Sequence, residues 1–236
     1  MIARFVIPPA RDAAFVAAME ALLDLYAPPP DPRRPLVCFD EAGKELQVAV
    51  RDPLPLRPGH PRREDPEYAR HGSANLFLAI APHLGHRAIL VTERRTRFDF
   101  AHALRHLVED IFPAADRLRL VLDNLNTHRP GSLYHAFPPA EAWRIARTLE
   151  WHYPPLHGSW LNLAELELSV LSRQWLARRI PDRATLATEV ATWVAARTAA
   201  TVGISWRFTV DDARRAMPHV YPLVPSDTSP VTDHSE

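Results

Sequence analysis

The chain of 236 residues carries 28 Lys and Arg against 28 Asp and Glu, so its overall charge would not attract a polyanion, and any such partner must meet a local basic patch. A single cysteine, Cys38, excludes an internal disulfide and is typical of a reducing compartment. The sequence has neither a signal-peptide pattern nor an apolar run of about 18 residues, so we expect no secretion signal and no membrane span.

The N-terminal region predicts one helix followed by a linker. The helix covers residues 11–26, where apolar side chains recur at helical spacing: Phe15, Met19, Leu22 and Tyr26. Three consecutive prolines at 28–30 end it, because proline lacks the amide hydrogen that a helix needs. We interpret residues 1–34 as a helical arm and a Pro-rich, semi-rigid linker.

The next stretches predict strands. Residues 35–50 predict two strands joined by a turn at 41–44, where Gly43 supplies a permissive backbone. Residues 51–72 are rich in Pro, Arg and His and lack a sustained period, which predicts a surface insertion. Two further strands are expected at 74–80 and 88–92.

Helices and strands then alternate. The expected elements are a helix at 98–111, a strand at 118–122, a helix at 139–149, a strand at 150–153, helices at 157–179 and 183–197, and an extended piece with a short helix at 204–217. Ser159, and Thr209 or Asp211, are the expected N-caps. The polar residues 223–236 predict a disordered tail. Hairpins first and crossovers later indicate an α/β fold with a mixed sheet.

The central stretch, LRLVLDNLNTH at 118–128, places a carboxylate where a buried strand stops. The nearly continuous apolar run before Asp123 is typical of a strand buried on both faces. Asp123 would then lie at the carboxyl end of the strand, where open α/β sheets bind their ligands. A helix N-cap or a turn former is the alternative interpretation of this residue.

Three carboxylates are the candidate chemical groups. Asp40 and Asp123 each end an apolar run, and Glu165 lies at the edge of the apolar stripe of the 157–179 helix, whereas Glu167 points to the far side. Each acid alone is more often structural. Together, such a trio could hold two hard cations such as Mg²⁺ about 4 Å apart and clamp both oxygens of an in-line phosphoryl displacement.

Three blocks make the prediction more specific: LVCFDE at 36–41, LVLDNLNTH at 120–128 and HYPPLHGSWLNLAELELSVLSRQ at 152–174. They resemble the signature blocks of bacterial insertion-sequence DDE transposases of the mariner-like superfamily. The likeness extends to residues 92–108 and 204–214, and so covers nearly the whole chain. It implies a ribonuclease-H-like α/β domain over residues 35–222, with a mixed five-stranded sheet flanked by helices.

The resemblance also implies residue roles. The matching residues are the metal-binding catalytic triad Asp40, Asp123 and Glu165, and the supporting residues Asn124, His128, Trp160 and Asn162. Two Mg²⁺ or Mn²⁺ ions would be the cofactors. The implied reaction is cleavage of the element's ends, followed by attack of the freed 3′-hydroxyl on target DNA. The implied partners are double-stranded DNA and a second copy of the chain, in the nucleoid region of the bacterial cytoplasm.

The sequence departs from the family pattern in two ways. The interval between Asp123 and Glu165 is somewhat longer than in many relatives, which the helix at 139–149 accommodates. Family members also carry helix-turn-helix DNA-binding domains ahead of this core, and nothing in this sequence matches them. We expect a truncated gene, or one product of a split or frameshifted reading frame, with a separate helix-turn-helix segment recognising the ends.

Arginine pairs are the candidate DNA contacts. A neutral chain needs such patches to meet phosphates, and we favour Arg62 and Arg63 in the insertion, and Arg94, Arg95 and Arg97 beside the sheet. Solvated surface charge is the alternative for any one pair. The 12 histidines and single cysteine form no zinc motif.

The sequence therefore predicts a divalent-metal-dependent transposase catalytic domain. Two alternatives stay open, namely a plain metal-dependent nuclease on the same fold and a non-mobile remnant that only binds DNA or a partner. The sequence contains no G-x-S-x-G, P-loop or G-x-G-x-x-G, which argues against serine hydrolases, nucleoside triphosphatases and Rossmann dehydrogenases.

Overall fold

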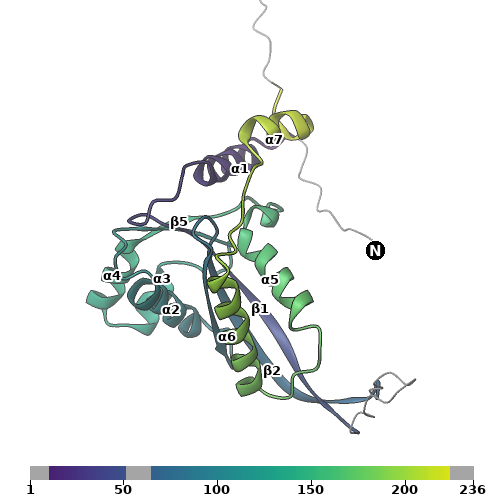
Figure 1. Cartoon of the computed structure of the whole chain (residues 1–236). Helices are drawn as coiled ribbons and strands as arrows, with labels where there is room; N and C mark the ends of the chain where they lie inside the picture. Colours follow the sequence, from purple (N-terminus) through teal and green to yellow (C-terminus); the bar gives the residue numbers. More distant parts are fainter. Residues whose placement is uncertain (1–10, 52–64, 224–236) are drawn as a thin grey trace, which may run out of the picture.

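The computed structural model describes residues 11–51 and 65–223, which fold around one mixed sheet (Figure 1). The strands are β1 (Leu36–Ala49), β2 (Tyr68–Ala81), β3 (His86–Thr92), β4 (Leu118–Leu122) and β5 (Leu149–His152), in the order β3-β2-β1-β4-β5. The pairs β1–β2 and β2–β3 are antiparallel, and the pairs β1–β4 and β4–β5 are parallel. The predicted mixed five-stranded sheet is confirmed.

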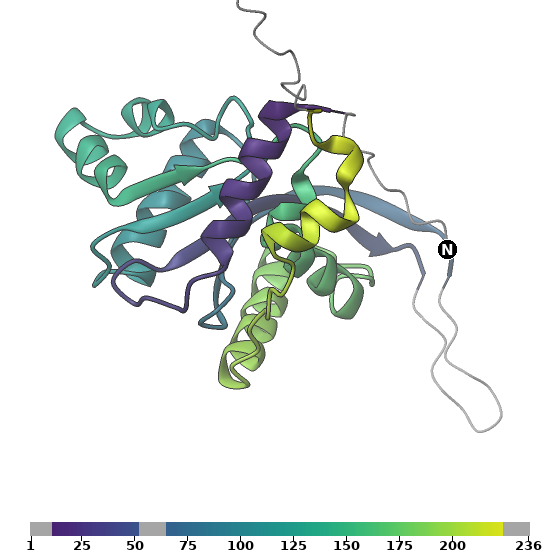
Figure 2. The ribbon, with the colours of Figure 1, turned by 90° about the horizontal axis from the view of Figure 1, so that it is seen from above.

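Helices cover both faces of this sheet (Figure 2). The face that presents Val37 and Phe39 is covered by α2 (Arg97–His106), α3 (Gly131–Ala136) and α4 (Pro139–Thr148). The opposite face, which presents Cys38, is covered by α1 (Ala13–Tyr26), α5 (Leu163–Gln174), α6 (Arg183–Ala199) and α7 (Val210–Ala216). Successive strand residues point to opposite faces, so β1 to β4 contribute to both layers of core, whereas β5 contributes Leu149 and Trp151 to one.

Two helical details differ from expectation. The helix predicted over 98–111 ends as a π-helical turn at Leu107–Ile111. The short helix α3 was not predicted, because its six residues are too few for an apolar period to show. At α7, Thr209 is the N-cap, in a capping box with Asp212, as one of the two expected alternatives.

The predicted turn at residues 41–44 is wrong. β1 runs unbroken through it, and Gly43 pairs with Asn75 of β2. This stretch lies within a long two-stranded ribbon of β1 and β2, where Lys44 donates to the Leu176 carbonyl at 2.7 Å, and the far end of the ribbon extends beyond the helices (Figure 1). Residues 68–72 belong to the same ribbon, so the predicted insertion at 51–72 is too long at its C-terminal end; residues 52–64 lie outside the described part.

The helix expected over 157–179 begins later and ends earlier. A 3₁₀ turn at Ser159–Leu161 precedes α5, and Asn162, not Ser159, is the N-cap, with its Oδ1 accepting a hydrogen bond from the Ala164 amide at 3.2 Å. The sequence pattern did not distinguish the 3₁₀ turn from the helix, because buried apolar residues occur both in the turn and in α5.

The first and last helices pack together on the sheet. The apolar face of α1, which includes Phe15, Met19 and Tyr26, is buried, and the Tyr26 hydroxyl donates to the Leu161 carbonyl at 2.6 Å. On α7, Arg214 pairs with Glu20 of α1 at 2.9 Å. The division into arm, catalytic domain and tail remains a prediction. Among the described helices, none combines the length and apolarity needed to cross a bilayer.

Candidate active site

Strand pairing brings the two aspartates together. β1 and β4 run parallel, with Phe39 opposite Leu122, so the next residues, Asp40 and Asp123, lie side by side where β4 ends. Asp40 is itself within β1, which continues past this point toward the ribbon. The carboxyl end of β4 is the edge at which α/β sheets place ligands.

The third carboxylate comes from α5. Glu165 lies in its first turn and is exposed to solvent at the rim of the site. The start of α5 is tied to the strand by Asn162, whose side-chain amide donates to the Phe39 carbonyl at 2.9 Å, one residue before Asp40. Asn162 therefore caps the helix and fixes its end beside the aspartates.

The three acids are close enough to affect one another. The pKa of Asp40 is raised to about 7, mainly by burial; the negative charges of Glu165 and Asp123 contribute to the rise, and the hydrogen bond from the Glu41 amide opposes it. Partial burial of the Glu165 carboxylate raises its pKa, the hydrogen bond from Ser159 lowers it, and the charge of Asp123 adds to the rise. Mutual repulsion of this kind favours a cation between the groups.

This donor set fits a hard divalent cation. All three groups offer oxygen, the ligand atom that Mg²⁺ and Mn²⁺ prefer. Within residues 11–51 and 65–223, no group of three or more His, Cys, Asp or Glu side chains is arranged so that it could hold a metal ion without further ligands or rearrangement. Mg²⁺ keeps several waters and takes further ligands from substrate phosphates, so the protein need supply only part of its coordination shell.

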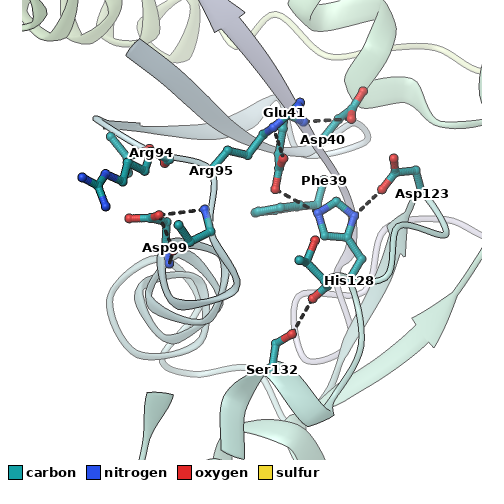
Figure 3. A network of polar contacts seen from close by, with 12 residues as sticks. Phe39, Asp40, Glu41, Arg94, Arg95, Asp99, Asp123, His128 and Ser132 are labelled. Atoms are coloured by element: carbon teal, nitrogen blue, oxygen red, sulfur yellow. Dashed lines mark hydrogen bonds and ion pairs between the residues drawn. The ribbon is translucent and has the colours of Figure 1, made fainter. Parts of the chain in front are cut away.

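A series of polar contacts runs from Asp123 through His128 and Glu41 to Arg95 (Figure 3). Of the last three residues, the sequence predicted a supporting role only for His128. The buried His128 contacts Asp123 Oδ1 through Nδ1 and Glu41 Oε1 through Nε2, the second contact at 2.9 Å. Burial disfavours the charged ring, but the hydrogen bonds to Asp123 and Glu41 outweigh it and raise the pKa of His128 to about 9. Glu41 in turn faces Arg95 at 3.5 Å.

Glu41 is the residue that sequence reasoning missed. Strand alternation places its side chain on the face opposite Asp40, so nothing in the local pattern joins it to the acids. Only the position of His128, 87 residues later, reveals the contact. The one signal in the sequence is that Glu41 directly follows Asp40.

The structure adds burial and two ion pairs to the predicted direction of Glu167. It does lie on the far side of α5 from Glu165, but it is buried, and its carboxylate pairs at 2.9 Å with Arg87 of β3 and with Arg197 of α6. The helical period predicted the direction of the Glu167 side chain. The side chain is buried because α6 and β3 pack against that side of α5.

The other predicted residues are spread around the rim. Asn124 is exposed, and its Oδ1 lies 3.5 Å from Arg129. Trp160 is 37% exposed and stacks on Trp206, with ring centroids 6.5 Å apart. The connection from β3 to α2 carries Arg94 and Arg95, and Arg97 begins α2 and lies 3.1 Å from His135. Arg62 and Arg63 lie outside the described residues.

Comparison with known proteins identifies the family. Residues 35–187 match the family described as DDE superfamily endonuclease, and the chain belongs to it. A search of curated proteins found no match.

Solved structures share the fold. The crystal structure of the Mos1 mariner paired end complex with Mn is 16% identical, with a TM-score of 0.52, and the match covers 85% of this chain and 62% of that chain. For the Mos1 Strand Transfer Complex the identity is 15%, the TM-score 0.52, and the coverage 85% and 61%. The chain thus has the expected ribonuclease-H-like fold and spans about three fifths of the Mos1 chains that it matches.

Proposed function

We propose that residues 35–222 form the catalytic domain of a bacterial insertion-sequence transposase, which cleaves DNA at the element's ends and joins them to a target. The observation that carries this proposal is the meeting of Asp40, Asp123 and Glu165 at one edge of the sheet, from three separate elements. Acids that are held together and partly buried cost a fold stability, so such a group is a candidate functional site. Membership of an endonuclease family also supports a DNA-cleaving activity.

In this proposal Asp40, Asp123 and Glu165 bind two Mg²⁺ or Mn²⁺ ions. When bound, these cations supply Lewis-acid stabilisation of the charge on a reacting phosphate. His128 holds Asp123 in place, and Asn162 holds the helix of Glu165 against the strand of Asp40. Trp160 and Asn124 line the rim.

The proposed partner is double-stranded DNA, both the transposon ends and the target. Exposed Arg94 and Arg97 would contact phosphates beside the acids, together with Arg62 and Arg63. The matched Mos1 structures are a paired end complex and a strand transfer complex, which is consistent with a homodimer that joins two ends. We place this activity in the bacterial cytoplasm at the nucleoid.

Nicking of supercoiled plasmid tests the catalytic role. With Mn²⁺ or Mg²⁺ present, Asp123→Asn should lower the nicking rate by about a hundredfold or more, as expected when a group that stabilises transition-state charge is removed. The matched control is Asp116→Asn, because Asp116 lies just before β4, at the other end of the same strand, and pairs with exposed Arg33. Retained nicking by a folded Asp123→Asn protein would remove Asp123 from the mechanism.

The same preparation separates the alternatives. Oligonucleotides carrying the terminal repeat that flanks the gene should yield joined products with a target plasmid. Nicking without joined products would favour a plain nuclease. DNA binding without metal-dependent nicking by the unaltered chain would favour a non-mobile remnant.

A further inference from the structure

Each aspartate of the site has one carboxylate oxygen already engaged, and Glu41 is involved in both cases. The backbone amide of Glu41 donates to Asp40 Oδ1 at 2.8 Å. The side chain of Glu41 reaches Asp123 indirectly, because it binds His128 Nε2 while His128 Nδ1 binds Asp123 Oδ1 (Figure 3). One residue thus contacts one aspartate through its main chain and the other through an imidazole.

The imidazole of His128 is held firmly between these carboxylates. It is fully buried, and its ring stacks on Phe100 with centroids 4.5 Å apart and an interplanar angle of 25°. The rings of His128 and Phe39 are nearly perpendicular, at 83°, with centroids 6.2 Å apart. The His128 carbonyl accepts a hydrogen bond from the Tyr153 hydroxyl at 2.9 Å, which fixes the backbone as well. Aromatic packing sets the plane of the ring, and the Glu41 contact sets which edge faces Asp123.

Glu41 is itself supported. Its side chain is 4% exposed, and a buried carboxylate is stable only when its oxygens have partners. His128 contacts Oε1 and Arg95 lies 3.5 Å from Oε2, so both oxygens face a donor. The side chain approaches from the α2–α3 face of the sheet, whereas Asp40 points to the opposite face, so Glu41 does not join the acidic trio.

We propose that Glu41 is a positioning residue for both aspartates, which leaves Oδ2 of each available to a divalent cation. This inference rests on the proposed function, since it assigns Glu41 a role toward the cation of that site. Without the Glu41 side chain, the His128 ring would no longer be held in place, and the Asp123 carboxylate would lose the fixed direction that this ring imposes. A purely structural role, in which Glu41 only neutralises buried charge, is the competing explanation.

Binding of Mn²⁺ alone to the full chain, followed by electron paramagnetic resonance, tests the proposal without requiring turnover. Glu41→Ala should weaken Mn²⁺ binding about tenfold, the usual effect of removing a partner behind a metal ligand. Glu41→Gln should retain most of the affinity, because its amide oxygen can still accept from Nε2. These variants probe the route to Asp123, since the Glu41 amide that holds Asp40 remains in each.

A double-mutant cycle separates positioning from general stabilisation. If Glu41 acts through His128, the Glu41→Ala/His128→Ala protein should bind Mn²⁺ no more weakly than His128→Ala alone. The matched control is Glu45→Gln, because Glu45 lies on the same strand and pairs with exposed Arg70, remote from His128. It should bind Mn²⁺ as the unaltered chain does. Thermal unfolding of every variant identifies those that fold, and if Glu41→Ala does not, Glu41→Asp replaces it, since its shorter side chain withdraws the carboxylate from Nε2.

The outcomes distinguish this inference from the proposed function. Mn²⁺ binding that depends on Asp40 and Asp123 but is unchanged by Glu41→Ala, or that falls additively in the double variant, would overturn the positioning role alone. Mn²⁺ binding that is the same in the unaltered chain and in Asp40→Asn/Asp123→Asn would overturn the proposed cation site, and this inference with it.

Discussion

Asp40 lies in a setting that favours its protonated form. It is partly buried beside two other acids, and its pKa is raised to about 7, mainly by loss of water around the carboxylate. The same features that would attract a divalent cation therefore cost the metal-free protein stability at neutral pH. Function and stability oppose each other at this residue.

The sign of this effect gives a prediction for the metal-free protein. Because the pKa of Asp40 is higher in the folded chain than its ordinary value of 3.8, the folded state binds the proton more tightly, and stability falls as the pH rises from about 4 through about 7. Asp40→Asn should therefore raise the free energy of unfolding at pH 8 by up to about 4 kcal/mol, and the gain should shrink toward pH 4. Urea denaturation with a chelator at pH 4, 6 and 8 measures it. An Asn variant that is no more stable at pH 8 would contradict the assignment.

At the scale of elements, α5 is the helix whose placement matters most. Its N-terminus is fixed by Asn162 on the Phe39 carbonyl, and two residues after Glu165 its buried face carries Glu167. Glu167 lies between Arg87 of β3 and Arg197 of α6, and both guanidinium groups lie near the ring of Trp193, at 5.9 and 5.0 Å. This ionic cluster joins α5 to the strand and helix beside it.

Breaking the cluster on one side should be costly. Glu167→Gln leaves the buried Arg87 without its counter-charge, so the free energy of unfolding should fall by about 3–5 kcal/mol. Arg87→Met/Glu167→Leu removes both buried charges and should recover most of that loss. Chemical denaturation of both proteins measures the difference. Glu93→Gln is the control, because Glu93 forms an exposed pair with Arg183 and should change stability by about 0.5 kcal/mol or less. A loss below about 1 kcal/mol in Glu167→Gln would show that this cluster does not stabilise the fold.

At the scale of the whole molecule, zero net charge means that DNA must be met by a local surface. Arg94 and Arg97 lie between β3 and the first turn of α2, and Arg95 between them touches Glu41, next to the acids. Arg33, in contrast, precedes the start of β1 and pairs with Asp116. Arg33, at the opposite end of the strands, can therefore serve as the control when the contribution of Arg94 and Arg97 to DNA binding is measured.

Salt dependence of DNA binding tests this surface. If Arg94 and Arg97 each contact a phosphate, replacing both by Ala should reduce the slope of log K against log salt by about 1.8, or about 0.9 for each contact. Binding of a fluorescent duplex at several salt concentrations gives the slope. Arg33→Ala should leave the slope unchanged, and an equal reduction in that variant would show that no patch beside the acids is responsible.

The sequence by itself determined the class of fold and the three candidate acids. The apolar run before Asp123 predicted the strand that ends there, and the resemblance of the three blocks around Asp40, Asp123 and Glu165 to a known family implied a ribonuclease-H-like core. These features are local, because periodicity and apolar runs record burial along one element. The assignment of the acids as metal ligands stays a prediction.

Only the tertiary structure decided which side chains meet. The unbroken β1 replaced a predicted turn because pairing with β2 outweighed the polar residues around Gly43. Glu41 joined the site through His128, and Glu167 became buried through Arg87 and Arg197. The physical reason is that such contacts depend on strand register and helix packing between residues far apart in the chain, and a local pattern does not record that register.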